Sequence, residues 1–233
     1  MHQEKANIMV IAHRGGAGLA FENTIEAFIN GEKLGADAIE CDVHLTKDMK
    51  LVVIHDPDLK RIAGVDEKIS ELNLNEIKKI KIGEDGFIPT LQEVLDSTTI
   101  ALIIELKSRN TTNEISKLLQ RNSKLLKRVA IISFDHWVIL KLKKEFPDLT
   151  TALLMTDIPA SPEIAANSCL TDTISLYYKG IDKNYVDLCH NKGIRINVWT
   201  VNGEKEIKEM IEAGVDAIAS DRPDLVLKEL GRK

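Results

Sequence analysis

The sequence lacks the features that mark several large classes of protein. Its three cysteines, Cys41, Cys169 and Cys189, are odd in number and lack the close spacing of metal ligands, so neither a disulfide framework nor a thiolate zinc site is indicated. No segment approaches the roughly 18 consecutive apolar residues that span a bilayer. The first apolar run is also too short for a signal-peptide core, so we expect a cytoplasmic protein without stable membrane insertion.

A strong charge of one sign and internal linkers are missing as well. The formal net charge of -5 gives no support for a nucleic-acid surface, so small molecules are the expected partners. No low-complexity tract divides the 233 residues, and a chain of this length can bury one substantial core. We therefore expect a single domain over residues 1–233, as a monomer or homodimer, with the polar connection 59–89 as a small excursion from it.

What the sequence does contain is a regular alternation of strand-like and helix-like segments. Short β-branched runs are followed by longer amphipathic stretches from end to end. This order predicts a parallel sheet, either doubly wound or closed into an eight-stranded barrel. The strand-like segments are 8–12, 38–45, 51–55, 101–107, 129–134, 151–155, 174–178, 195–201 and 216–220.

Nine strand candidates are one more than an eight-stranded barrel holds. Segments 38–45 and 51–55 are separated by only five residues, far fewer than a parallel crossover needs, so we expect an antiparallel hairpin after the second strand. If the two residues that flank this loop face each other, His55 lies beside Cys41 and Asp42. A histidine would then stand next to carboxylates at one end of the barrel.

Glu40 and Asp42 are two residues apart in an apolar strand, so their side chains point to the same face. Neighbouring carboxylates that lose their hydration cost on the order of several kcal/mol unless a cation or hydrogen-bond donors offset the loss. A divalent metal ion would supply that cation. The alternative is that this end of the strand is simply solvated.

A second charged pair, Glu105 and Lys107, shares one face at the C-terminal end of another apolar strand, where the active sites of barrel enzymes are found. Glu105 would add a third carboxylate to Glu40 and Asp42. Such hard oxygen ligands suit Mg²⁺ or Ca²⁺ rather than zinc. The alternative for Glu105 and Lys107 is an internal ion pair that ties the strand to its loop.

His13 and His55 each follow directly on an apolar strand, in VIAHRG and VVIHDP. A histidine with a pKa of about 6.5 can act as acid or base at neutral pH, and two of them can serve the two ends of a phosphoryl transfer. Arg14 can grip a phosphate with two parallel hydrogen bonds. Taken singly, each histidine could instead be a packing residue, and Trp199 could line a pocket or belong to the core.

Together these segments resemble the glycerophosphodiester phosphodiesterase family, barrel enzymes related to the phosphatidylinositol-specific phospholipases C. The motifs HRG, ENT, ExD, HD and ExK, in that order, form a far more specific signature than any one of them. Phe21 departs from the proline that is common in the family before Glu-Asn-Thr, and the 59–89 connection is too short for a large family-type insertion. The similar stretches include AHRGGAGLAFENTIEAF, GADAIECDVHLTKDMKLVVIHDPDLKR, IIELK, NVWTVN and GVDAIASDRPDL.

The resemblance implies a TIM (β/α)8 barrel that hydrolyses glycerophosphodiesters to sn-glycerol 3-phosphate and an alcohol. It implies His13 and His55 as the acid/base pair, and one divalent cation, Mg²⁺ or Ca²⁺ with Mn²⁺ as a further candidate. Lysophospholipase D-like activity on single-chain lysophospholipids and a non-catalytic barrel that binds a phosphate ester are the alternatives. The implied metal ligands are Glu40, Asp42 and Glu105, and the implied substrate-binding residues are Arg14, Glu22, Lys107 and Trp199.

Overall fold

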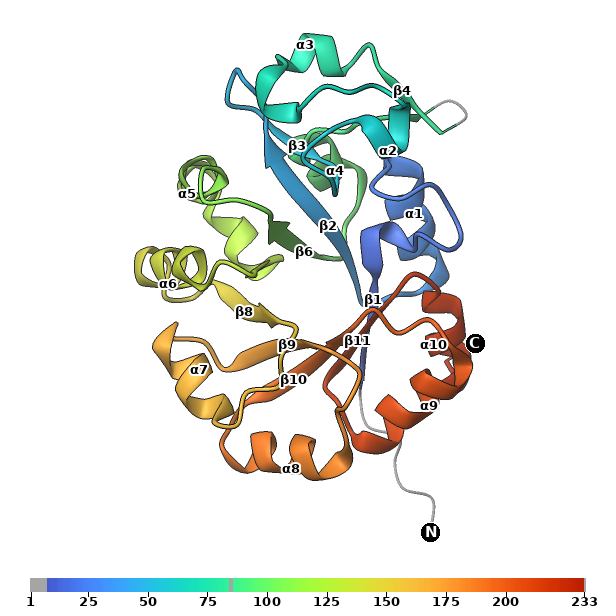
Figure 1. Ribbon diagram of the computed structural model, residues 1–233, viewed down its shortest axis with the longest axis vertical. Coiled ribbons are helices and arrows are strands. Elements are labelled where there is room, and N and C mark those ends of the chain that lie inside the picture. The colour runs from blue at the N-terminus through green and yellow to red at the C-terminus, as the bar shows by residue number, and fades with distance from the viewer. Residues whose placement is uncertain (1–7, 84–85, 233) are drawn as a thin grey trace.

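The computed structural model describes residues 8–83 and 86–232, which form a closed parallel barrel of strands surrounded by helices (Figure 1). The barrel strands, each parallel to its neighbours, are β1 (Met9–Ala12), β2 (Ala38–Leu45), β6 (Ala101–Leu106), β7 (Val129–Ser133), β8 (Thr150–Met155), β9 (Thr173–Tyr177), β10 (Arg195–Trp199) and β11 (Ala217–Ser220). β1 closes the barrel by pairing with both β2 and β11. The TIM barrel is therefore confirmed, and a doubly wound sheet is excluded.

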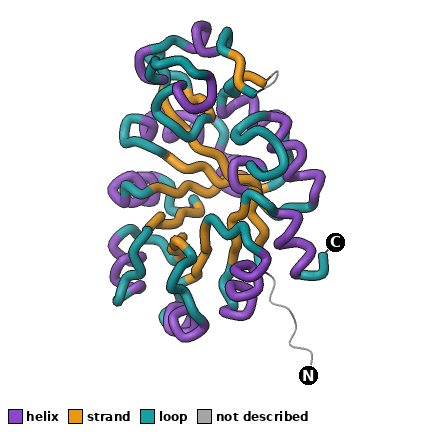
Figure 2. The backbone as a smooth tube through the Cα atoms, turned by 45° about the vertical axis from the view of Figure 1, so that its right-hand side comes forward, coloured by secondary structure: helices purple, strands orange, loops and turns teal. Residues whose placement is uncertain are grey.

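Helices connect the strands and cover the outside of the barrel, as Figure 2 shows. They are α1 (Ile25–Leu34), α4 (Leu91–Ser97), α5 (Thr111–Arg121), α6 (His136–Glu145), α7 (Pro162–Ser168), α8 (Lys183–Asn191), α9 (Glu204–Ala213) and α10 (Pro223–Glu229), with the 3-10 turns η1 (His13–Gly15) and η3 (Ser123–Lys127). No helical pattern was recognised in the sequence of α7. Within the described ranges, no helix is both long and apolar enough to cross a membrane.

The alternation of side chains along each strand produces two apolar layers. Ile39 and Cys41 of β2 face outward and belong to the same buried cluster as Phe28 of α1. Ala38, of the opposite parity, belongs to a separate cluster with Ile103 of β6 inside the barrel. Because successive side chains of a strand point to opposite faces, the charged residues of β2 that share the parity of Ala38 face the barrel interior.

The predicted hairpin is present and has the predicted register. β3 (Leu51–Val53) runs antiparallel to β2, with Leu45 opposite Leu51. The strand ends at Val53, two residues before the predicted end. The pairing nevertheless continues through one hydrogen bond, in which Ile54 N donates to Asp42 O at 2.9 Å. His55 therefore follows directly on the part of the hairpin that lies beside Asp42.

The 59–89 segment lies at one end of the molecule, at the top of Figure 1. Its elements are α2 (Lys60–Ala63), η2 (Ile69–Glu71), α3 (Leu74–Ile77), β4 (Lys81–Ile82) and β5 (Gly86–Phe87). The segment packs a small apolar cluster of its own, which includes Leu59, Ile69 and Ile77, against Val52 and Ile54 of the hairpin. The hairpin therefore joins this segment to the barrel.

Gly15 lets the turn after β1 pack directly against α1. Its φ of +84° lies in the left-handed region, and a Cβ atom at this position would come within 2.7 Å of the carbonyl carbon and Cβ of Ala27. The space that the missing side chain leaves is thus occupied by helix backbone. This close contact fixes the turn that carries the histidine and arginine after β1.

We predict that Gly15→Ala destabilises the protein by more than about 3 kcal/mol, because left-handed strain and a backbone clash add together. Gly64→Ala is the matched control, since Gly64 is also left-handed, with a φ of +69°, but a Cβ atom there would have no other atom within 4 Å. It should cost about 1 kcal/mol. Urea unfolding measures both, and equal losses would contradict the close contact at Gly15.

Candidate active site

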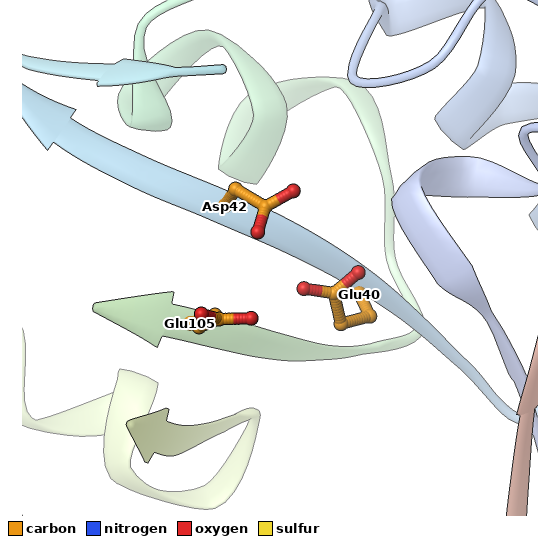
Figure 3. Close-up of side chains that lie close together, drawn as sticks. All are labelled: Glu40, Asp42 and Glu105. Carbon is orange, nitrogen blue, oxygen red and sulfur yellow. The ribbon is translucent and has the colours of Figure 1, made fainter. Parts of the chain in front are cut away.

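Three carboxylates from neighbouring strands converge toward the C-terminal end of the barrel. Glu40 and Asp42 lie on β2 and Glu105 on β6, where Asp42 and Glu105 are partners in the strand register. Each offers an oxygen atom within 4.8 Å of the others, and Figure 3 shows the three side chains gathered beside the two strands. All three are buried, and Asp42 is only 1% exposed. A solvated strand end, the alternative left open by the sequence, is therefore wrong.

Burial and mutual repulsion change the proton affinity of these carboxylates. Burial, followed by the charge of Asp42, raises the pKa of Glu40 to about 8. The same two causes raise the pKa of Glu105, although Lys107 opposes them. For Asp42, burial is the strongest influence and acts upward, but Lys107 and Arg14 outweigh it and lower the pKa. At neutral pH and without a bound cation, Glu40 therefore keeps a proton while Asp42 is ionised.

Two oxygen atoms of this cluster are suited to a metal ion. Among the described residues, Glu40 Oε1 and Asp42 Oδ1 are buried and have no hydrogen-bond partner. The Lys107 ammonium lies 3.3 Å from Asp42 Oδ1, as an ion pair. A buried carboxylate oxygen without a partner is costly, and a cation would satisfy both atoms. The three carboxylates, as a set of oxygen ligands, fit a hard divalent cation.

Two positively charged side chains flank the carboxylates. Lys107 Nζ lies 2.7 Å from Glu105 Oε1, so the ion pair that the sequence offered as an alternative exists and is part of the cluster. Arg14 Nε lies 3.3 Å from Asp42 Oδ2, and the backbone N–H of Arg14 donates to Glu40 Oε2 at 3.0 Å. Arg14 makes this contact with a left-handed φ of 51°, which is uncommon outside glycine.

His13 is held by a carboxylate from the far end of the chain. Its Nδ1 lies 2.6 Å from Asp221 Oδ1, and because an ionised carboxylate only accepts hydrogen bonds, Nδ1 carries the proton. Its Nε2 faces Glu40 Oε2 at 3.9 Å. Burial is the strongest influence and acts to lower the pKa of His13, but Asp221 and Glu40 outweigh it and raise the pKa. Asn202 Nδ2 donates to the second oxygen of Asp221 at 2.7 Å.

His55 is held by its neighbour in the sequence. Its Nδ1 lies 2.7 Å from Asp56 Oδ1, which leaves Nε2 as the ring nitrogen available for a ligand. The backbone carbonyl of His55 accepts a hydrogen bond of 3.0 Å from His44 Nε2. His44, which the sequence analysis did not place in the site, therefore supports the loop that carries His55.

Glu22 lies at the rim of the site rather than in the carboxylate cluster. Its Oε1 accepts hydrogen bonds from Arg14 Nη1 at 3.2 Å and from Arg61 Nη2 at 2.6 Å, and its Oε2 accepts from Arg61 Nη1 at 3.1 Å. A carboxylate has about four acceptor positions. Glu22 therefore keeps about one position for a hydroxyl of a bound molecule.

A cavity of about 320 Å³ brings most of the predicted residues together. His13, His55, Lys107 and Trp199 are among its lining residues, as are Arg14, Glu40 and Glu105. Phe134 lines the wall with Trp199, and their rings meet edge to face with centroids 5.6 Å apart. The indole N–H of Trp199 donates to Ser175 O at 3.1 Å. Trp199 is thus a wall residue of the cavity, one of the two options that the sequence left open.

Several supporting residues escaped the sequence analysis. Asn23 Nδ2 donates to Asp42 Oδ2 at 2.9 Å, while its neighbour Thr24 caps α1. The sequence analysis gave no role to Asp221, and it included Asp56 only in the HD motif. For Asp221 the available signal was a polar residue directly after a barrel strand, β11.

Comparison with known proteins gives one consistent result. The model of the glycerophosphoryl diester phosphodiesterase family matches residues 13–225. A glycerophosphodiester phosphodiesterase of Caldanaerobacter subterraneus subsp. tengcongensis is 35% identical over an alignment of 234 positions, gaps included. The alignment covers 94% of this chain and 96% of that protein. A lysophospholipase D of Homo sapiens is 28% identical over 276 residues, covering 96% of this chain and 87% of that protein.

The same likeness extends to solved structures. A glycerophosphodiester phosphodiesterase from Parabacteroides distasonis superposes with a TM-score of 0.86 at 30% identity, and the match covers 98% of each chain. The match to the family model begins at His13, in the turn after β1, and ends beyond Asp221. With the barrel and the convergent carboxylates, these matches show that the chain belongs to the glycerophosphoryl diester phosphodiesterase family.

Proposed function

We propose that the chain is a metal-dependent phosphodiesterase that hydrolyses glycerophosphodiesters to sn-glycerol 3-phosphate and an alcohol. The observation that carries this proposal is a cavity lined by two histidines, two cationic side chains and the carboxylates of Glu40 and Glu105, with the Asp42 carboxylate beside these two. Each is a group that phosphoryl transfer uses, either to move protons or to stabilise negative charge. The family membership and the name of the Caldanaerobacter relative support the same reaction.

The carboxylate cluster is the proposed metal site. Glu40, Asp42 and Glu105 would hold one divalent cation, Mg²⁺ or Ca²⁺ with Mn²⁺ as a further candidate. Bound there, the cation supplies positive charge beside the phosphoryl oxygens. Arg14 and Lys107, which already lie at the edge of the cluster, would hold the phosphate by charge-assisted hydrogen bonds.

The two histidines are the proposed acid/base pair. One would accept a proton from the attacking water, or from the substrate's own glycerol hydroxyl if a cyclic ester forms first and water then opens it, and the other would donate a proton to the leaving alkoxide oxygen. Asp221 and Asp56 each bind the Nδ1 side of one ring. The Nε2 atoms of His13 and His55 are therefore the positions at which protons would be exchanged with the substrate.

Two further residues would bind the organic part of the substrate. Trp199, held through its indole N–H, offers an aromatic surface in the cavity wall. Glu22 keeps about one acceptor position beside its contacts with two arginines, and this position suits a glycerol or headgroup hydroxyl. Glu22 is already engaged by two arginines and Trp199 does not titrate, so we assign both residues to binding.

A second candidate activity is lysophospholipase D-like hydrolysis of single-chain lysophospholipids. The observation that favours it is the apolar lining of the cavity, where Ile11, Ile103 and Leu154 line the barrel interior. The human relative that carries the name lysophospholipase D supports the same candidate. The two activities share the phosphodiester chemistry and differ in the organic group that the cavity admits.

We expect purified protein to release glycerol 3-phosphate from glycerophosphocholine with Mg²⁺, Mn²⁺ or Ca²⁺, and to stop when a chelator is added. His13→Ala should lower turnover by about 10²- to 10⁴-fold, the usual contribution of a single acid/base group. His190→Ala is the matched control, because this histidine pairs with Asp216 away from the carboxylate cluster, and it should keep wild-type turnover. No hydrolysis of any glycerophosphodiester with any of these metals would refute the proposal.

We also expect metal affinity to depend on pH. The raised pKa of Glu40, about 8, means that its carboxyl is protonated below that pH when no cation is bound, and a metal ion must displace the proton. Affinity should fall about tenfold per pH unit below pH 8 and level off above it. Calorimetric titration with Mn²⁺ from pH 6 to 9 measures this. His13→Ala should keep the slope, whereas an affinity independent of pH would contradict the assignment to Glu40.

Direct competition between the two candidate substrates distinguishes the two candidate activities. Glycerophosphocholine and lysophosphatidylcholine carry the same headgroup, so a ratio of their kcat/KM values reports only the effect of the acyl chain. We expect glycerophosphocholine to be preferred. A higher kcat/KM for lysophosphatidylcholine, measured below its critical micelle concentration, would favour the second activity.

A further inference from the structure

Arg61, in the first turn of α2, uses all of its nitrogen groups to hold two carboxylates. Its Nε donates to Asp56 Oδ2 at 2.5 Å, while Nη1 and Nη2 donate to the two oxygens of Glu22 at 3.1 and 2.6 Å. Glu22 belongs to the loop after β1 and Asp56 to the loop after β3. The rigid fork of a guanidinium therefore joins two loops that lie far apart in the sequence.

The side chain of His55 depends on this contact. Asp56 accepts from His55 with one oxygen and from Arg61 with the other, so the carboxylate cannot rotate without losing a bond. The imidazole is about one-third exposed, which means that polar contacts rather than core packing set its orientation. His44 holds only the backbone of this residue. Arg61 thus fixes the orientation of the Asp56 carboxylate, and this carboxylate fixes the orientation of the His55 ring.

The contact of Arg61 with Glu22 leads to Arg14, one of the two residues proposed to hold the phosphate. Glu22 Oε1, held by Arg61, also accepts from Arg14 Nη1 at 3.2 Å. Arg14 in turn lies 3.3 Å from a carboxylate oxygen of Asp42. A chain of charged contacts therefore runs along the rim from the His55 loop to the carboxylate cluster, and Arg61 is its central member.

We propose that Arg61 is a positioning residue for the reaction, which acts on His55 through Asp56 and on Arg14 through Glu22. The proposal rests on the proposed function, because turnover is its main readout. Arg61 contacts neither His13 nor the carboxylate cluster directly in the hydrogen bonds and ion pairs of the described residues. The short 59–89 segment thereby contributes to the active site through the Arg61 side chain of α2.

The exposure of the Arg61 side chain distinguishes a role in positioning His55 and Arg14 from a role in folding. The side chain of Arg61 is 49% exposed, and exposed ion pairs contribute little to stability because solvent screens them. Loss of the guanidinium should therefore leave the unfolding temperature nearly unchanged. Loss of orientation at a proton-transfer group is different, since a displacement of about 1 Å can cost about 10²-fold in rate.

The test compares Arg61→Ala, Arg61→Lys and Arg109→Ala in steady-state hydrolysis of glycerophosphocholine. Arg61→Ala should lower kcat roughly 10- to 100-fold with a smaller change in KM. Arg61→Lys should stay near the alanine variant, because one ammonium cannot bridge two carboxylates in a fixed geometry. Arg109→Ala is the matched control, since Arg109 also holds a carboxylate, Asp135, with two nitrogen atoms, and it should match the wild type.

Two outcomes of this comparison would overturn the proposal. In the first, Arg61→Ala keeps a kcat within twofold of the wild type. In the second, Arg61→Lys restores full activity, which would mean that charge alone suffices. A double-mutant cycle with Asp56→Asn adds a third test, because Arg61→Ala should cause a smaller loss in that background, limited to its contact with Glu22 and Arg14. Losses that multiply would show that Arg61 does not act through Asp56.

A readout without turnover separates this inference from the proposed function. The ¹⁵N shifts of the His55 ring, in histidine-labelled protein at a pH where the ring is neutral, report which nitrogen carries the proton. Arg61→Ala should increase the share of the form protonated at Nε2, because Asp56 is no longer fixed at Nδ1. Unchanged shifts would overturn the inference. If the variant shows this change but the wild type hydrolyses no glycerophosphodiester, only the proposed function is refuted.

Discussion

The repulsion among three buried carboxylates is the constraint on which the rest of the site depends. Two charges a few ångströms apart interact far more strongly in a protein interior than in water, so the cluster persists only with compensation. Lys107, Arg14 and Asn23 supply it on the protein side. The raised pKa of Glu40 shows that this compensation is incomplete. The remaining deficit of positive charge is what a divalent cation would fill.

The alternation and the register of the barrel strands place these charges. Alternation along β2 directs Ile39 and Cys41 toward the helices and the carboxylates between and beyond them toward the interior. The parallel register then sets Asp42 opposite Glu105. No loop has to fold around a ligand to create the cluster, because the barrel strands β2 and β6 already carry it. The segments that follow the strands contribute the two histidines and most of the residues proposed to bind substrate, whereas Trp199 is the last residue of β10.

This division explains how much the sequence could predict. Strand period and spacing were enough for a parallel sheet, for the hairpin register and for the common face of Glu40 and Asp42, and the family resemblance favoured the closed barrel over the doubly wound sheet. They could not predict that Asp221 holds His13, because that contact joins residues 208 positions apart. Arg61 was equally out of reach, since its contacts depend on how a short polar segment folds back over the rim. Local patterns report which face a residue occupies, and the fold decides which side chains meet.

The pairing of β1 with β11, and of His13 with Asp221, has a consequence for the synthesis of the chain. All three carboxylates are translated within the first half of the sequence, and so are both histidines. The strand β11, which pairs with β1, and Asp221, which holds His13, are synthesised after all the other barrel strands. A growing chain that has not yet reached β11 therefore holds the carboxylates and the two histidines without their final arrangement, and the site becomes complete only when β11 has left the ribosome and paired with β1.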